Sequence, residues 1–287
     1  MTRLGHLPLL ATLILLLGSA SASAQGLLAI QRAADFTRDE PVTWSVGVNG
    51  GYDRLQYDQA NDQFPDIDSF FLQSGVGVIY TKMDRRTPWS LDVNGGVLHY
   101  LDDAPRDDDT YYSARAAFNI AHELSERLKI SNNFYATYEV EPNTAMGAST
   151  TLWNGQYFYG YENFNISYAW SRRITTTTSY TIDGIRYDDG LASQSEDRLS
   201  QLVAQQFSYA LKPRTQLTAE YRFRYVNFAN RSDVDYRSHY ALAGVDHAWS
   251  QRTTTSLRGG AEFFQSDRRD TAAPYGEFAL THAVDRK

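Results

Sequence analysis

The chain of 287 residues has no cysteine and only 3 methionines. Without cysteine there is no disulfide framework, so the small disulfide-stabilised secreted scaffold is excluded, as is an anchor on an acylated cysteine. Basic residues are in the minority, because 27 Lys and Arg stand against 34 Asp and Glu and give a formal net charge of -7. Since a nucleic-acid partner requires a basic surface, no nucleic acid is expected among the partners.

The chain also lacks a long apolar segment after Gln25. Before that residue, Arg3 is followed by an apolar stretch over residues 9–17 and by the small residues 22–24 (ASA). This order predicts a signal peptide over residues 1–24, followed by a periplasmic N-terminal leader over residues 25–41. The apolar stretch is shorter than the roughly 20 residues that a membrane-spanning helix needs, so it is an export signal and not an anchor.

Aromatic residues are abundant, with 20 Tyr, 14 Phe and 5 Trp, and they alternate with polar residues along extended segments. For example, Trp89, Leu91 and Val93 fall on one face of a strand, and Ser90 and Asp92 fall on the other. This period of two is typical of β-strands, and it keeps the mean hydropathy low even in a barrel that spans a membrane. The predicted strands lie near residues 42–57, 68–81, 89–101, 110–124, 128–140, 156–170, 174–187, 199–211, 215–228, 238–249, 253–265 and 275–284.

A short turn recurs between these strands. It reads ring, small or polar residue, apolar residue, and then three residues that end in a cation, as in residues 168–173 (YAWSRR) and 247–252 (HAWSQR). The other connections are longer and acidic, at residues 58–67, 102–109, 141–155, 188–198, 229–237 and 266–274. Short periplasmic turns and long extracellular loops are typical of outer-membrane barrels.

The predicted fold is therefore all-β, an antiparallel up-and-down transmembrane β-barrel of about 12 strands over residues 42–287. The strands are longer than the usual 5 to 6 residues of globular proteins and long enough to cross a bilayer at a tilt. The sequence stops where earlier repeats turn into another strand. Two expectations stay open: twelve strands close the barrel, or a longer parent supplies further strands.

Residues 182–189 (IDGIRYDD) and 257–263 (LRGGAEF), with the aromatic alternation and the Ser-x-Arg turns, resemble the outer-membrane β-barrel porin family known as porin 2. The resemblance extends over most of the chain after residue 24, and its motifs describe architecture and turns. It implies an outer-membrane barrel, a channel, and a parent longer than this chain. It implies no catalytic or ligand-binding residue.

Two sets of residues are candidates for a role in such a barrel. Charged residues on the polar face are expected to line the lumen and filter solutes; they are Asp92, Arg115, Glu123, Glu139, Asp183, Glu220, Arg222, Arg224, Asp246, Arg258 and Glu262. Rings next to the short turns are expected to form a girdle at the membrane interface; they are Trp89, His122, Tyr168, Trp170, Tyr209, His247, Trp249 and His282. The histidines lie on different hairpins without ligand spacing, so neither a metal nor another cofactor is expected.

The function expected from these features is passive diffusion of small hydrophilic solutes through a porin-like channel in the outer membrane of a Gram-negative-type bacterium. The outer-membrane lipid is the second expected partner, and the oligomeric state is left open. Two alternatives remain: an outlet of an envelope polysaccharide export system, and a closed barrel with a structural or adhesive role. No nucleophile motif such as Gly-x-Ser-x-Gly is present, so enzymatic activity is not expected.

Overall fold

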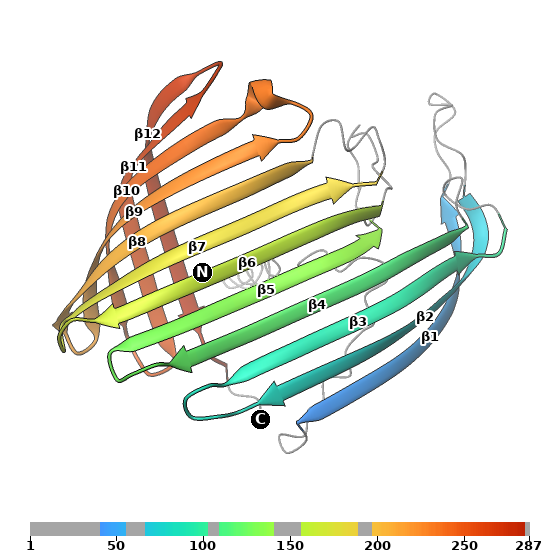
Figure 1. The fold of residues 1–287 in the computed structure, drawn as a ribbon, viewed down its shortest axis with the longest axis horizontal. Coiled ribbons are helices and arrows are strands. Elements are labelled where there is room, and N and C mark those ends of the chain that lie inside the picture. Colours follow the sequence, from blue (N-terminus) through green and yellow to red (C-terminus); the bar gives the residue numbers. More distant parts are fainter. Residues whose placement is uncertain (1–40, 56–66, 103–108, 141–155, 189–196, 285–287) are drawn as a thin grey trace, which may run out of the picture.

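The computed structural model describes residues 41–55, 67–102, 109–140, 156–188 and 197–284 (Figure 1). The predicted signal peptide (1–24) and nearly all of the predicted leader (25–41) lie outside the described residues. None of the helices in the described part of the chain is long and apolar enough to cross a membrane.

Twelve strands follow one another along the chain, with one short 3-10 helix, η1, between the ninth and the tenth. Their bounds are β1 Val42–Leu55, β2 Ile67–Lys82, β3 Trp89–Tyr100, β4 Thr110–Glu123, β5 Leu128–Val140, β6 Gln156–Ala169, β7 Ile174–Tyr187, β8 Arg198–Lys212, β9 Thr215–Phe228, η1 Ser232–Val234, β10 Tyr236–Ala248, β11 Thr253–Ser266 and β12 Asp270–His282.

All strands belong to one sheet, in which each strand pairs antiparallel with its neighbours in the sequence. The sheet curls strongly, so that β10 to β12 lie behind the strands in front (Figure 1). Within the described residues, the strand order runs from β1 to β12 and no pairing joins these two edges. The predicted all-β, antiparallel up-and-down fold of twelve strands is confirmed.

Most predicted strand bounds lie within two residues of the observed ones, but the start of the last strand was predicted wrongly. β12 begins at Asp270, and the connection predicted as a long loop over residues 266–274 is a tight turn instead. The backbone N–H and C=O groups of Ser266 and Arg269 bond to each other at 3.0 and 3.3 Å. Pro274 lies within β12, where a proline is tolerated because, among the described residues, this strand pairs with β11 alone.

The recurring short turns are held by their serine. In each of three turns the hydroxyl oxygen accepts backbone N–H bonds from the residues two and three positions later, at 3.0 to 3.2 Å. The serines are Ser125, Ser171 and Ser250. A side chain that replaces missing backbone partners favours a tight turn, which explains why the Ser-x-Arg pattern recurs.

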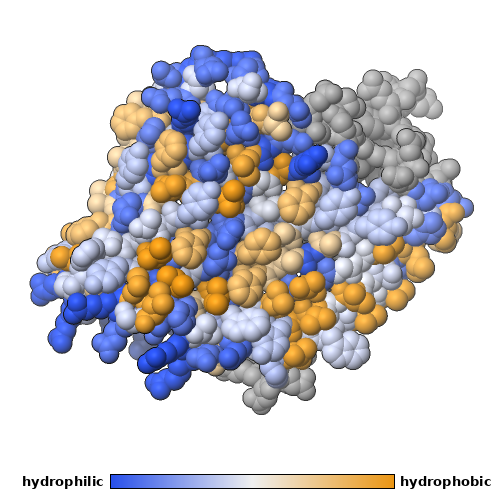
Figure 2. All heavy atoms as spheres, in the orientation of Figure 1, coloured by the Kyte–Doolittle hydropathy of each residue, from blue (hydrophilic) through white to orange (hydrophobic). Residues whose placement is uncertain are grey.

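The two faces of the sheet differ in exposure and chemistry. On the outer face, Trp44 is 74% exposed and Val46 is 64% exposed, whereas Ser69 and Ser238 on the inner face are fully buried. Hydrophobic residues form patches on the side turned toward the viewer in Figure 2, and hydrophilic residues gather at the strand ends. The concave inner face crowds its side chains together, and this crowding produces the candidate site.

Candidate functional site

All the predicted lumen residues lie on the inner face of the sheet. Residues that pair directly across two strands share a face, so the register carries the assignment from strand to strand. The structure brings Glu220, Arg222, Asp246 and Arg258 together on β9 to β11. Asp92, Arg115, Glu123, Glu139 and Asp183 lie elsewhere on the inner face. The role of these residues as a filter stays a prediction.

Arg222 forms the centre of the assembled group. Its guanidinium binds both carboxylate oxygens of Glu277 on β12, with Nη1–Oε1 at 2.5 Å and Nη2–Oε2 at 3.0 Å. The same guanidinium binds Glu220 on its own strand, with Nε–Oε1 at 2.6 Å and Nη2–Oε2 at 3.1 Å. Neighbouring strands are spaced about 4.8 Å apart, so three strand steps on a flat sheet span roughly 14 Å. The contact between β9 and β12 therefore shows how tightly the inner face curves.

Arg258 on β11 links the remaining carboxylates. Its nitrogens lie 3.5 Å from Glu220, 3.7 Å from Asp246 and 3.9 Å from Glu277. We name this group the charge cluster, consisting of Glu220, Arg222, Asp246, Arg258 and Glu277. It contains three carboxylates and two guanidiniums, so one negative charge is left over.

A glycine makes room for Arg258. Gly244 on β10 pairs directly with Arg258, and a Cβ atom at Gly244 would lie 2.7 Å from the arginine Cγ and 2.3 Å from the carbonyl oxygen of Leu257. Such contacts are shorter than van der Waals distance, so a larger residue would displace either the arginine or the strand. Glycine at this position thus permits the close approach that the charge cluster needs.

Tyrosines line the inner face of β5 to β7 near the loop end. The Tyr157 hydroxyl donates a hydrogen bond to Glu139 at 2.9 Å, and the rings of Tyr135 and Tyr159 lie 6.1 Å apart. The guanidinium carbon of Arg115 lies 5.0 Å from the centre of the Tyr135 ring, which is cation–π distance. This part of the wall combines hydroxyl groups, aromatic faces and charges of both signs.

The other predicted lumen residues have separate partners. Asp92 accepts a hydrogen bond from Asn94 at 2.7 Å, and Glu262 accepts one from Tyr240 at 2.7 Å. Arg224 donates to Ser200 at 3.2 Å. Glu123 forms an ion pair with Lys129 at the turn end of the wall. Each of these pairs lies within one strand or joins two adjacent strands, so it holds its side chains close to the wall.

Sequence reasoning missed two features of this face. Glu277 was not proposed, although its alternation with Phe278 and Leu280 in the predicted last strand marks the polar face. The inner tyrosines of β6 were also missed, because both faces of this strand carry aromatic residues and the period gives no contrast. Phe158 and Phe164 lie on the outer face, and Tyr157, Tyr159 and Tyr161 lie on the inner one.

The predicted girdle residues lie next to the short turns, and those within strands lie on the outer face. Three histidines share one contact, in which the ring Nδ1 lies 2.7 to 3.0 Å from a threonine hydroxyl on the neighbouring strand or turn. Trp170 and Trp249 each donate an indole hydrogen bond to a threonine, at 2.9 and 3.0 Å. The histidines are His122, His247 and His282. The remaining predicted rings are Trp89, Tyr168 and Tyr209. The interfacial role of all eight rings stays a prediction.

The turn over residues 83–88 has one acidic residue with a perturbed pKa. The Asp84 carboxylate accepts backbone N–H bonds from Arg86 at 2.8 Å and Thr87 at 3.4 Å. Hydrogen bonds to the charged form favour it, so they hold the pKa of Asp84 below its ordinary value. The carboxylate thereby stabilises the turn.

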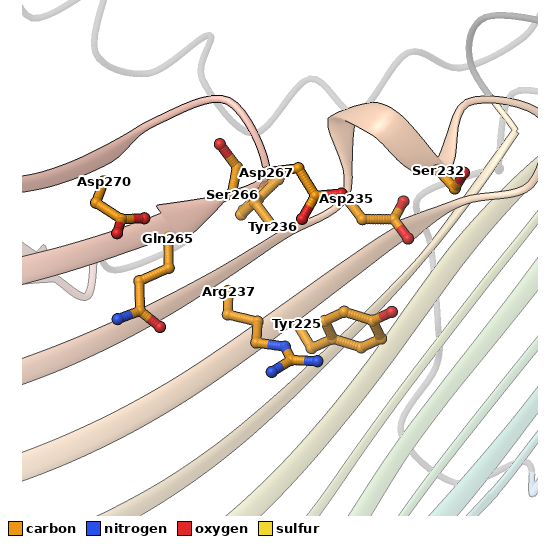
Figure 3. A pocket seen from close by; sticks show the side chains of 9 residues that line it. All are labelled: Tyr225, Ser232, Asp235, Tyr236, Arg237, Gln265, Ser266, Asp267 and Asp270. Carbon is orange, nitrogen blue, oxygen red and sulfur yellow. The ribbon is translucent and has the colours of Figure 1, made fainter.

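A hollow of about 540 Å³ lies at the loop end of β9 to β12 (Figure 3). Arg237 lies over the ring of Tyr225, with 5.5 Å between the guanidinium carbon and the ring centre. Asp235 accepts hydrogen bonds from the Asn227 side chain and the Phe228 N–H, so this carboxylate holds the loop. No histidine lines the hollow, and the described part of the chain contains no group of three or more metal-ligating side chains arranged for an ion.

Comparison with known proteins gives limited matches. Residues 47–155 match the model of a family described as a protein of unknown function, DUF481. No curated protein matches the chain. Among solved structures, the chain is similar to one described as KdgM porin, with a TM-score of 0.34 and 6% sequence identity. The similarity covers 85% of this chain and 100% of that chain.

Proposed function

We propose that this chain is an outer-membrane β-barrel protein that acts as a porin-like channel for the passive diffusion of small hydrophilic solutes. The observation that carries the proposal is the contrast between the two faces of one curved sheet. The outer face exposes aromatic and aliphatic side chains, and the inner face holds charged and hydroxyl side chains in hydrogen-bonded groups.

The outer face fits lipid better than water. Trp44, Val46, Val48 and Val76 are each more than half exposed and belong to adjacent strands, β1 and β2. A soluble protein rarely exposes so continuous an apolar surface, whereas the lipid-facing side of a barrel requires one. The predicted signal peptide supplies the export that an outer-membrane location needs.

A membrane location also requires hydrogen-bond partners for the outer edges of the two edge strands, β1 and β12. Within the hydrocarbon core every backbone N–H and C=O group needs a partner, because no water is there to replace it. We infer that the edges of β1 and β12 are paired in the membrane, either with each other or with a further strand. Membership of the porin 2 family, which implies a longer parent, remains a prediction.

The inner face favours hydrophilic solutes with a weak preference for cations. The charge cluster has one more carboxylate than guanidinium, and charges close to a lumen select ions by their sign. Lumen width grows with the number of strands, and twelve strands fall between the filled barrels of about 8 strands and the open pores of about 16. Small solutes are therefore the expected cargo. No catalytic role is part of the proposal.

Planar-bilayer recording tests this function. The purified chain is expected to give steady conductance steps and, under a salt gradient, a reversal potential that indicates cation preference. Replacing Arg222 with methionine removes a positive charge from the cluster and is expected to strengthen that preference. The same replacement of Arg269 in the exposed turn after β11 serves as the control and is expected to leave the reversal potential unchanged.

A closed structural barrel is the second candidate. It is favoured by the ion pairs between Arg222 and Glu277, because they join β9 to β12 across the inner face and take up lumen volume. Silent bilayers from a protein with intact β circular dichroism would favour this candidate and refute the channel.

A further inference from the structure

Hydrophilic side chains interrupt the outer face of β5 to β8, in the middle of the strands. Five of them form what we name the polar patch: Asn132, Glu162, Thr178, Gln201 and Gln205. The register places each on the same face as the exposed Phe158, Ile166 and Phe207. Hydrophilic residues among hydrophobic ones are visible on this side in Figure 2.

The polar patch contrasts with the outer face of the first four strands. At mid-strand, β1 to β4 present Val46, Val76, Val93 and Ala116. On β9 and β10 the outer face is mixed: Gln205 pairs with Tyr221, whose hydroxyl lies 2.7 Å from the His239 ring nitrogen, and Gln201 pairs with Tyr225. The polar patch therefore sets β5 to β8 apart from β1 to β4.

The members of the patch are only partly satisfied by one another. Asn132 donates to Glu162 at 2.8 Å, and Thr178 donates to Gln205 at 2.6 Å. The Gln201 side-chain oxygen accepts from Tyr180 at 3.1 Å. A carboxylate accepts up to four hydrogen bonds and an amide donates two, so this group can make more bonds than it does. The Gln205 amide nitrogen reaches two backbone oxygens only at 3.4 Å.

Such a patch is costly in contact with lipid. The hydrocarbon core offers no hydrogen-bond partner, and ionisable residues that face it are rare and serve a function. Given the membrane location that the proposed function includes, a protein surface that donates and accepts hydrogen bonds is the environment that fits these side chains.

We propose that the polar patch is an interface at which a second copy of this chain binds. The patch is self-complementary, because amides and hydroxyls both donate and accept, and Glu162 supplies acceptors that neutral amides can satisfy. Ile182 on the central strand β7 pairs with Glu162 of β6 on one side and with Gln201 of β8 on the other. A two-fold axis near β7 therefore sets β6 of one copy against β8 of the other, and the amides on β8 then face the carboxylate of the second copy.

Cysteine cross-linking in isolated outer membranes tests this interface, since the chain has no cysteine of its own. Thr178→Cys places a thiol on β7, near the proposed axis. Val93→Cys is the matched control, because both residues are exposed on the outer face and are the fifth residue of a strand that follows a short turn. Oxidation is expected to link most of the Thr178→Cys chains into covalent homodimers and to leave Val93→Cys monomeric.

Two measurements of the oligomeric state test the interface without relying on the cysteine variants. Native mass spectrometry of the unmodified chain in detergent is expected to show a dimer, and the double replacement of Glu162 and Gln205 by leucine is expected to reduce the dimer fraction several-fold. Equal cross-linking at both positions, a product containing another protein, or a monomer in detergent would overturn the interface. A chain that is embedded and conducts ions but stays monomeric refutes this inference alone, whereas a chain absent from the outer membrane refutes the proposed function.

Discussion

The charge cluster gives the most quantitative prediction, for the replacement of Arg222 by methionine. The variant keeps a long apolar side chain but leaves Glu220 and Glu277 without the guanidinium that both bind. A hydrogen bond to a charged group contributes about 1.5–3 kcal/mol, and breaking a fully buried ion pair costs about 3–5 kcal/mol. The three side chains are 18%, 9% and 29% exposed, so solvent screens the remaining charges in part.

Arg258 further reduces the loss, because it lies 3.5 Å from Glu220 and 3.9 Å from Glu277 and remains in place. We therefore expect the free energy of unfolding to fall by about 2–3 kcal/mol. For a chain of this size that loss lowers Tm by roughly 4–12 °C.

Urea unfolding of the chain in lipid vesicles, followed by tryptophan fluorescence, measures this loss. Arg224→Met is the matched control: it changes the same residue type on the same face of the same strand, but Arg224 donates to the neutral hydroxyl of Ser200. Its expected cost is about 0.5–1.5 kcal/mol. A double-mutant cycle with Glu277→Gln isolates the coupling between the two charges. Equal losses for both arginines, with a coupling below about 0.5 kcal/mol, would refute the reasoning.

Three further predictions concern other parts of the sheet. Gly244→Ala is expected to overpack the inner face and to lower the free energy of unfolding by about 1–3 kcal/mol. Gly259→Ala, whose Cβ would meet nothing within 4 Å, is expected to be nearly neutral in the same unfolding assay. Val93→Arg at mid-strand on the outer face is expected to cost about 2–4 kcal/mol in lipid, and Asn94→Arg on the inner face much less; similar costs would contradict the assignment of the faces. Since the pKa of Asp84 is lowered in the folded turn, the turn is most stable above the ordinary value of 3.8 and loses this contribution as the pH falls through the lower, folded pKa. Hydrogen exchange in residues 83–88, corrected for intrinsic rates, is therefore expected to accelerate at low pH in the native chain but not in Asp84→Asn.

The alternation of polar and apolar residues was sufficient to predict the twelve strands and the face on which each lumen candidate lies. Side chains alternate between the two faces of a strand, so the positions of the apolar residues also show which residues face the other way. The turns were predictable for a similar local reason, since the serine hydroxyl and the backbone N–H groups that it binds are within three residues of each other.

Contacts that depend on curvature could not be predicted in this way. Glu277 meets Arg222 because the sheet bends, and no spacing in the sequence encodes that bend. The start of β12 was also missed: a proline is uncommon inside a strand, and Pro274 is tolerated because, among the described residues, β12 pairs with β11 alone. Glu162 was not recognised as facing outward, because a charged residue in an alternating strand is expected on the polar face.

The assignment of one face to lipid and the other to water is tested most directly by single cysteines at residues 90–95 of β3, in a chain that otherwise has none. Each variant is reconstituted in lipid vesicles and treated with a water-soluble maleimide. We predict labelling at Ser90, Asp92 and Asn94 and protection at Leu91, Val93 and Gly95. Uniform labelling along the strand, or labelling confined to the odd-numbered positions, would contradict the account.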